Sequence, residues 1–271
     1  MKNLYKIVII IMAASLWSGC QKMERPALGD YPKDVSAPGG PLKFYVAFDG
    51  ITKDSLLNAV DSIMANFPST NPLKSIDGVS RKAVEGEKGK YINYASTNGF
   101  VHSSSFSISL WIKTNIIPEK ESLFLFSVPT TVGHWSNATM FALIDHKGAG
   151  TTVDGAVLKF FILDKKGENW FEFTGNDKIP GLLNNAWHHL VFTYNETNST
   201  FSLYKDGVLY KTRLWNNHGK LEINSDKVTG LRLLGKTTDW GEEWQGGMDQ
   251  FRLYGKALSE EEIAELYKGK K

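Results

Sequence analysis

The amino-acid sequence predicts an all-β protein in which two antiparallel sheets pack as a sandwich. Between residues 42 and 271, short runs that alternate or are rich in aromatic residues recur with turn residues between them. No strand–helix–strand alternation, the pattern of a parallel sheet, interrupts them. The 15 Phe, 10 Tyr, 8 Trp and 25 Gly residues suit strands and tight turns. We expect strands at Lys43–Phe48, Lys90–Tyr94, Phe106–Lys113, Ser122–Val128, Met140–Ile144, Val157–Leu163, Trp170–Thr174, Trp187–Tyr194, Thr200–Lys205, Val208–Leu214, Leu231–Leu234 and Met248–Tyr254.

Two of these strands carry local signals of how they pair. Asp206-Gly207 separates a pair of strands, and such a two-residue loop supplies the positive φ angles of a type I′ hairpin. In the strand 106–113, apolar side chains alternate with Ser107, Ser109 and Trp111. This alternation predicts one face in the core and one partly covered face.

Two short helices complete the predicted elements. The C-terminal helix begins with a capping box, because Ser259 stands three residues before Glu262. An N-terminal-side helix is expected to begin near Asp54 or Ser55 and to end before Pro68. Its apolar positions at helical spacing are Leu56, Val60, Ile63, Met64 and Phe67.

The first nineteen residues are expected to be a signal peptide. Lys2 and Lys6 precede an apolar run, residues 7–17, that is too short to span a bilayer. The run ends in small residues before Cys20 and resembles a bacterial lipoprotein signal, which implies a lipid on the Cys20 sulfur. The alternative is an ordinary secretory peptide with an incidental cysteine. Residues 20–41 are rich in Pro and Gly and are expected to form a spacer, which leaves 42–271 as one domain.

Charge and cysteine content exclude several classes of function. The chain has 31 basic and 29 acidic residues, so it lacks the basic field that nucleic-acid binding requires. A nearly neutral protein is not drawn to a membrane by charge, so the lipid is expected to be its only membrane contact. The single Cys excludes an intrachain disulfide and a cysteine zinc site. Gln21, where an inner-membrane retention signal has Asp, favours the outer membrane and the cell surface.

Three segments together resemble a known family. They are the strand 106–113, the pair of segments 186–195 and 201–209 with Trp187, two His and Asp206-Gly207, and the closing segment 246–263. In this order they resemble the laminin-G-like, concanavalin A-like jelly rolls over residues 43–269. The resemblance implies a jelly-roll fold, but that fold serves lectins, adhesins, enzymes and spacers alike. Lipoproteins of this layout are typical of glycan-foraging Gram-negative bacteria.

Seven residues are the predicted ligand contacts. Trp111 and Trp187 match core positions of the family, so packing is expected for them. The other tryptophans have amide and carboxylate neighbours, a chemistry that suits sugars, because indoles stack on C–H faces while the polar groups bond hydroxyls. The alternative is that they cover sheet edges, and that Glu168 and Glu172 form a solvated polar face. The predicted contacts are Trp135, Trp170, Glu168, Glu172, Trp215, Trp240 and Trp244.

The sequence favours a protein without catalytic activity. The Glu-x-Asp-x-x-Glu motif of the laminarinase-type enzymes on this fold is absent. Glu168 and Glu172 stand four apart on a strand, about 13 Å, too far for a glycosidase pair. Adjacent His188 and His189 point to opposite sheet faces and cannot share a metal.

A structural calcium ion is implied by the resemblance. Asp49 and Asp249 match positions near which relatives hold such an ion. Carboxylate and carbonyl oxygens are the ligands that Ca²⁺ prefers. We therefore expect Ca²⁺ in a structural role near these two residues.

These observations favour an outer-membrane-tethered, non-catalytic lipoprotein that captures a polysaccharide or oligosaccharide for envelope glycan-uptake proteins. One alternative is a diverged polysaccharide hydrolase or lyase. Another is an adhesion or scaffold module that contacts envelope or host proteins.

Overall fold

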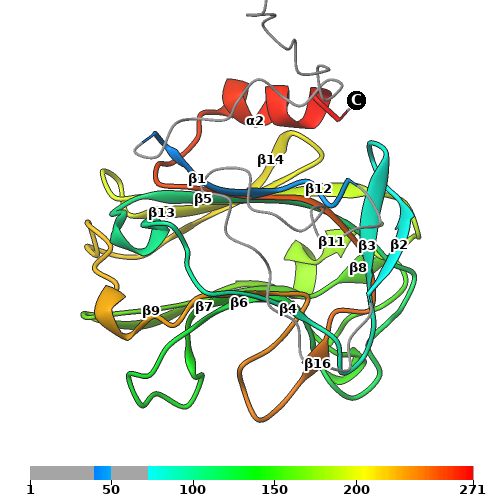
Figure 1. Cartoon of the computed structure of the whole chain (residues 1–271), viewed down its shortest axis with the longest axis horizontal. Coiled ribbons are helices and arrows are strands. Elements are labelled where there is room, and N and C mark those ends of the chain that lie inside the picture. The colour runs from blue at the N-terminus through cyan, green and yellow to red at the C-terminus, as the bar shows by residue number, and fades with distance from the viewer. Residues whose placement is uncertain (1–39, 50–72, 271) are drawn as a thin grey trace, which may run out of the picture. The chain divides into compact units, whose positions relative to one another are not determined.

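Two antiparallel sheets face each other in the computed structural model, which describes residues 40–49 and 73–270 (Figure 1). The eight-stranded sheet has the order β14 (Val208–Leu214), β13 (Thr200–Lys205), β12 (His188–Asn195), β5 (Phe106–Lys113), β17 (Gly246–Tyr254), β3 (Lys82–Gly86) and β2 (Lys74–Asp77), with β1 (Leu42–Val46) also paired to β17. The seven-stranded sheet has the order β10 (Gly167–Phe173), β9 (Leu158–Asp164), β7 (Ala138–Ile144), β6 (Leu123–Pro129), β15 (Leu231–Leu233) and β4 (Ile92–Tyr94), with β16 (Glu242–Glu243) beside β6.

The predicted sandwich and its strands are confirmed. Each of the twelve expected strands has a counterpart, with ends that differ by a few residues. The structure adds five short strands: β2, β3, β16 and the separate pair β8 (Gly155–Ala156) and β11 (Ile179–Pro180). The four residues of β2 are exposed or half-buried, so they lack the apolar alternation that marks a strand in sequence.

The core lies between the sheets and is rich in phenylalanine. Phe106, Ile108 and Leu110 of β5 are fully buried in it, as the alternation predicts. Phe160 of the opposite sheet stacks on Phe106, with 5.9 Å between the ring centroids. This close-packed layer holds the two sheets at a fixed separation, and with them the loops at their ends.

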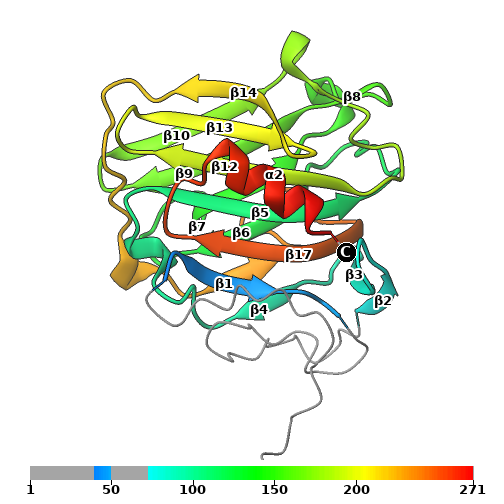
Figure 2. The ribbon, with the colours of Figure 1, turned by 90° about the horizontal axis from the view of Figure 1, so that it is seen from above.

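Helix α2 (Glu260–Lys268) covers the outer face of the eight-stranded sheet (Figure 2). Its Ile263 is fully buried against Val191 and Tyr204. Trp111, on the face of β5 away from the main core, is buried and lies 5.5 Å from the Tyr267 ring. The predicted capping box of Ser259 and Glu262 is present. The helix thus explains why this second face of β5 is apolar at Trp111.

The Asp206-Gly207 hairpin forms as predicted, with φ angles of 53° and 79°. A Cβ on Gly207 would also lie 2.9 Å from Cβ of Tyr267. Glycine is therefore required at position 207 for two reasons, the positive φ angle of the turn and the close approach of α2.

Several expectations lie outside the described residues. They are the signal peptide, Cys20, nearly all of the spacer and the helix around residues 56–67. Within 40–49 and 73–270, no helix is both long and apolar enough to cross a membrane.

We expect Ile263→Ala to lower the free energy of unfolding by about 2–4 kcal/mol, because it leaves a cavity between α2 and the sheet. Urea unfolding measures this change. Exposed Glu265 forms only a surface ion pair with Lys268, so the control Glu265→Ala changes stability by less than about 0.5 kcal/mol. Equal effects of the two substitutions would contradict a packed helix.

Candidate functional site

The seven-stranded sheet is apolar on its outer face as well as on its inner face. Phe160 and Ile162 of β9 point into the main core, whereas Phe161 between them points outward into a second cluster. Phe161 stands opposite Phe141 of β7 in the antiparallel register. Because neighbouring strands carry apolar residues at matching positions, a continuous apolar strip crosses this outer face.

Three tryptophans cover this strip, and we call them the indole surface: Trp135, Trp170 and Trp240. The rings of Trp135 and Trp170 are nearly parallel, with 6.0 Å between centroids and an interplanar angle of 9°. Trp240 lies on the other side of Trp135, at 6.4 Å and 26°. Trp135 and Trp240 remain 46% and 37% exposed, so the cover itself presents aromatic area to solvent.

Each tryptophan reaches the surface from a different part of the chain. Trp170 lies in β10 opposite Phe161. Trp135 belongs to the loop between β6 and β7, and Trp240 to the loop between β15 and β16. The two loops are joined by a hydrogen bond from Thr237 Oγ1 to the Ser136 carbonyl at 3.1 Å. The surface is therefore held by sheet and loop contacts together.

Gly241 sets the position of Trp240. It has a φ of 76°, and a Cβ there would lie 2.4 Å from the Phe124 ring. Its N–H donates to Glu121 Oε2 at 2.9 Å. The chain can therefore bring Trp240 to 5.0 Å from Phe124 only with glycine at position 241.

Glu168 borders the indole surface beside Trp135. Its Oε2 accepts a hydrogen bond from Trp135 Nε1 at 3.1 Å, and His134 Nε2 lies 2.9 Å from the same oxygen. The carboxylate thereby orients the exposed indole. Its other oxygen, Oε1, makes no hydrogen bond or ion pair within the described residues and can accept a hydrogen bond from a hydroxyl.

Glu172 belongs to a separate ionic network on the same face. Lys159 Nζ lies 3.1 Å from Glu172 and 2.9 Å from Asp145. Burial raises the pKa of Asp145, but hydrogen bonds from Ser122, Lys159 and His146 outweigh it and hold that pKa at about 2. Glu168 and Glu172 thus have different partners, and the structure does not bring them together as an acid/base pair.

Two predicted contacts lie elsewhere. Trp244 is fully buried in the main core, and its Nε1 donates to the Gly247 carbonyl at 3.2 Å. The expectation of a ligand contact at Trp244 is therefore wrong, because no face of its ring is accessible. Trp215 stacks on His218 at 3.5 Å and packs against the main core, apart from the indole surface. Trp187, expected in the core, is only partly buried and lies over Gly247.

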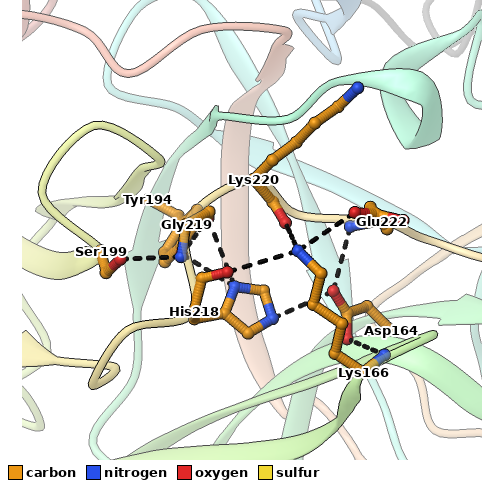
Figure 3. A network of polar contacts seen from close by, with 8 residues as sticks. All are labelled: Asp164, Lys166, Tyr194, Ser199, His218, Gly219, Lys220 and Glu222. Carbon is orange, nitrogen blue, oxygen red and sulfur yellow. Dashed lines mark hydrogen bonds and ion pairs between the residues drawn. The ribbon is translucent and has the colours of Figure 1, made fainter.

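Figure 3 shows a buried carboxylate–imidazole–phenol chain formed by Asp164, His218 and Tyr194. It lies beside Trp215, whose ring stacks on His218. His218 Nε2 is 3.0 Å from Asp164 Oδ2, and its Nδ1 is 2.9 Å from the Tyr194 hydroxyl. That hydroxyl donates to the Gly219 carbonyl at 2.6 Å, while backbone N–H groups of Lys166 and Glu222 donate to Asp164. Since the two ends of the chain are engaged by backbone groups, it joins β9, β12 and the loop at 215–222 and leaves no nucleophile free.

His188 and His189 are structural, as their opposite orientations predict. His188 lies 2.9 Å from Asp206 and 3.0 Å from Asn184. His189 bonds Ser109 and stacks on Trp111, and its burial lowers its pKa to about 3. In the part of the chain that the structure describes, no three His, Cys, Asp or Glu side chains form a group suited to a metal ion.

Asp49 and Asp249 do lie close enough to influence each other. Asp249 Oδ2 accepts the Val79 N–H at 2.8 Å, whereas buried Oδ1 has no hydrogen-bond partner among the described residues. Burial, with a smaller contribution from the charge of Asp49, raises the pKa of Asp249 to about 8. Burial also raises the pKa of Asp49. The site therefore disfavours the state in which Asp49 and Asp249 are both ionised without a cation beside them.

A hollow of about 720 Å³ lies between the β2–β3 hairpin and the ends of β5 and β17. Lys74, Lys82 and Lys113 line it together with three carboxylates. None of the predicted ligand residues lies there, so its size does not identify it as the site.

A family profile described as concanavalin A-like lectin/glucanases superfamily matches residues 86–264. This chain belongs to that superfamily. The match confirms the family resemblance of the three sequence segments. Mouse usherin is 25% identical over 126 residues, which are 44% of this chain and 2% of usherin, so the chain spans a small part of that relative.

Solved structures share the fold of this superfamily member at low identity. Domain 4 of AbnA, an extracellular arabinanase of Geobacillus stearothermophilus in complex with arabinotriose, aligns with a TM-score of 0.58 and 18% identity. The alignment covers 83% of this chain and 98% of that domain. The binding domain of botulinum neurotoxin DC in complex with SialylT aligns with a TM-score of 0.59 and 12% identity, covering 85% of this chain and 52% of that chain.

The sequence gives no indication of the polar partners of the indole surface. His134, Lys159 and Asp145 stand in different elements, and only the folded sheet brings them to Glu168 and Glu172. The position of Lys159 could have been predicted from the sequence. Lys159 and Phe161 are two residues apart on a mostly apolar strand, so their side chains lie on the same face of it.

We expect Asp249→Asn to stabilise the protein increasingly as pH rises in the presence of a chelator. The folded state holds a proton on Asp249 up to about pH 8, whereas the unfolded state loses it near the ordinary value of 3.8. The free energy of unfolding of the parent protein therefore falls between about pH 4 and 8, by on the order of a few kcal/mol, and the variant lacks this fall. Urea unfolding across that range measures both proteins. Exposed Asp239→Asn is the control, and parallel curves for Asp249→Asn would contradict the burial argument.

Proposed function

We propose that this protein binds glycan without cleaving it, on the indole surface of the seven-stranded sheet. The observation that carries the proposal is that the rings of Trp135, Trp170 and Trp240 lie side by side and nearly parallel, with Trp135 and Trp240 exposed to solvent. Aromatic faces pack on the C–H faces of sugar rings, and the flanking Glu168 and Glu172 accept hydroxyl hydrogen bonds. A rigid, shallow surface of this kind binds by contact area and does not enclose its ligand.

Two structural neighbours support a carbohydrate partner. The arabinanase domain was solved with arabinotriose, and the neurotoxin binding domain with SialylT. At 18% and 12% identity these likenesses concern the fold, so the sugar and the position of binding are argued from the residues of this chain.

The charge around the indole surface favours a neutral glycan. Lys159 is already paired with Asp145 and Glu172, and Glu168 adds a further carboxylate. An anionic sugar would be repelled by these carboxylates, and the cations that contact them within the described part of the chain, His134 and Lys159, are already paired.

A structural Ca²⁺ near Asp49 and Asp249 is also proposed. The unpartnered Asp249 Oδ1 and the raised pKa of both carboxyl groups fit a bound cation, which would relieve their repulsion. Two carboxylates supply only part of the six to eight oxygens that Ca²⁺ takes, so carbonyls and water complete the set. Added calcium would then raise the melting temperature of the parent protein but not that of Asp249→Asn.

We further propose that a lipid on Cys20 tethers the domain at the outer membrane, where it captures glycan for uptake proteins. The signal-like residues 1–19 and the Pro-rich spacer support this location. A tether would raise the local concentration of many weak binding surfaces at the cell surface, which suits a shallow site.

We expect Trp135→Ala and Trp240→Ala each to weaken glycan binding roughly 5- to 10-fold, since each removes about 1 kcal/mol or more of aromatic contact. The measurement is affinity electrophoresis of the full chain through gels containing arabinan, galactomannan, laminarin or xyloglucan, with alginate as the anionic comparison. Trp215→Ala is the matched control and retains binding.

Three outcomes would redirect the proposal. Retention that survives both substitutions would place the site elsewhere, and no retention by any polysaccharide would favour a protein-contacting scaffold. Release of reducing sugar from a retained polysaccharide would favour the hydrolase alternative.

We expect Cys20→Ala to move the protein from the membrane fraction to the soluble fraction of a Gram-negative host, because the acyl chains are its proposed membrane contact. Radiolabelled palmitate incorporation is measured in parallel, with Gln21→Ala as the control. Labelling of the parent that persists in Cys20→Ala would contradict lipidation at this residue.

A further inference from the structure

We propose that the hollow at the β2–β3 hairpin is a second saccharide-binding site, separate from the indole surface. Its ligand is a short, uncharged stretch of glycan. Three observations carry the inference: the face on which the hollow lies, the glycines in its wall and the balance of charge in its lining. The inference goes beyond the proposed function, because the two sites lie on different sheets and either can bind without the other.

The hollow lies on the outer face of the eight-stranded sheet. Met248 of β17 is buried in the main core, so the preceding residue, Gly247, faces away from it. Gly247 stands opposite Glu85 of β3 on one side and Lys113 of β5 on the other. All three residues line the hollow, whose volume of about 720 Å³ lies within the range of about 300–1,000 Å³ for small-molecule sites. The indole surface belongs to the outer face of the other sheet, so the two regions are on opposite sides of the sandwich.

Two adjacent glycines line the hollow where other strand residues would carry side chains. A Cβ on Gly247 would lie 2.6 Å from the Trp187 ring and 3.1 Å from Ile76 Cδ1. Gly246 has a φ of 144°, and a Cβ there would lie 2.3 Å from the Lys113 carbonyl oxygen. Glycine within a strand often marks a place where a ligand or another segment approaches the backbone closely. This part of the wall is therefore backbone, flanked by an indole edge and an isoleucine.

Acidic and basic side chains line the hollow in equal number. The lysines are Lys74, Lys82 and Lys113, and the carboxylates are Asp77, Glu85 and Glu87. Because Glu85 and Lys113 flank Gly247, a ligand at this glycine meets a carboxylate on one side and an ammonium group on the other. The carboxylate accepts hydrogen bonds and the ammonium group donates them. A lining of balanced charge favours an uncharged ligand that carries several hydroxyl groups.

The remaining lining favours a sugar over a protein segment. Asn115 and Asn185 contribute amide groups, which both donate and accept hydrogen bonds. Ile76 and Ile116 are the large apolar side chains among the lining residues. Protein partners usually bury aromatic or aliphatic anchors in an apolar pocket, and two isoleucines offer little of that. Amide, carboxylate and ammonium groups instead match the hydroxyl groups of a sugar ring.

Nuclear magnetic resonance of the full chain tests the two sites separately, because each has its own tryptophan. Trp187 lies over Gly247, and its ring centroid is 6.0 Å from Lys113 Nζ, so its indole N–H signal reports on the hollow. The Trp135 indole reports on the indole surface. The probes are short oligosaccharides from arabinan, galactomannan, laminarin and xyloglucan, with alginate oligomers as the anionic comparison and trialanine as the peptide. We expect a neutral oligosaccharide to shift the Trp187 and Gly247 signals along a saturable curve.

Glu85→Gln and Asn115→Ala assign this curve to the hollow. Each is expected to raise the dissociation constant for the hollow about three- to tenfold, the loss of about one hydrogen bond. The curve for the indole surface is expected to stay unchanged. Exposed Glu119→Gln and Asn216→Ala are the matched controls, since neither residue lines the hollow, and they change neither curve.

The outcomes distinguish this inference from the proposed function. Shifts at Trp135 without shifts at Trp187 and Gly247 overturn the second site and leave glycan binding at the indole surface intact. The reverse result supports the hollow and contradicts the indole surface. Shifts in the hollow with trialanine or alginate alone, or unchanged affinity in Glu85→Gln and Asn115→Ala, overturn the assignment of a neutral saccharide. Absence of shifts at both places overturns both proposals.

Discussion

The two apolar faces of each β-sheet are the constraint on which the rest of the structure depends. In a two-layer sandwich one face of each sheet is buried against the other sheet, and the outer faces ordinarily meet water. Here Trp111 and Val191 on one outer face, and Phe141 and Phe161 on the other, are also buried. Both outer faces therefore require a cover, and the chain provides two covers of different kinds.

The difference between the covers has a functional consequence. Helix α2 satisfies its own backbone hydrogen bonds and seals its sheet with a few apolar residues such as Ile263. The seven-stranded sheet is covered by indoles, which bury one face and leave the other edge or face in water. Trp135 and Trp240 remain partly exposed because they are single side chains from loops, and no further element packs over them within the described residues.

Electrostatics then shape what this exposed aromatic area can take. The acidic groups around it have specific partners. Glu168 contacts His134 and Trp135. Asp145 accepts hydrogen bonds that lower the pKa of its carboxyl group. Because His134 and Lys159 already pair with these carboxylates, the surface offers hydrogen-bond acceptors and aromatic contact.

The sequence by itself determined the features that depend on local periodicity and turn chemistry. The strands, the Asp206-Gly207 hairpin and the Ser259 capping box follow from such rules, and the family follows from three ordered segments. Glu168 and Glu172 could therefore be placed on one strand in advance.

Only the tertiary structure decided which tryptophans meet. Trp240 and Trp244 share one short segment with similar neighbours, yet one covers the outer face and the other fills the core. Trp135 and Trp240 lie about a hundred residues apart and meet because β6, β7 and β15 belong to the same sheet. Contacts of such separation depend on strand order and loop closure across the whole sandwich, for which local sequence carries no signal.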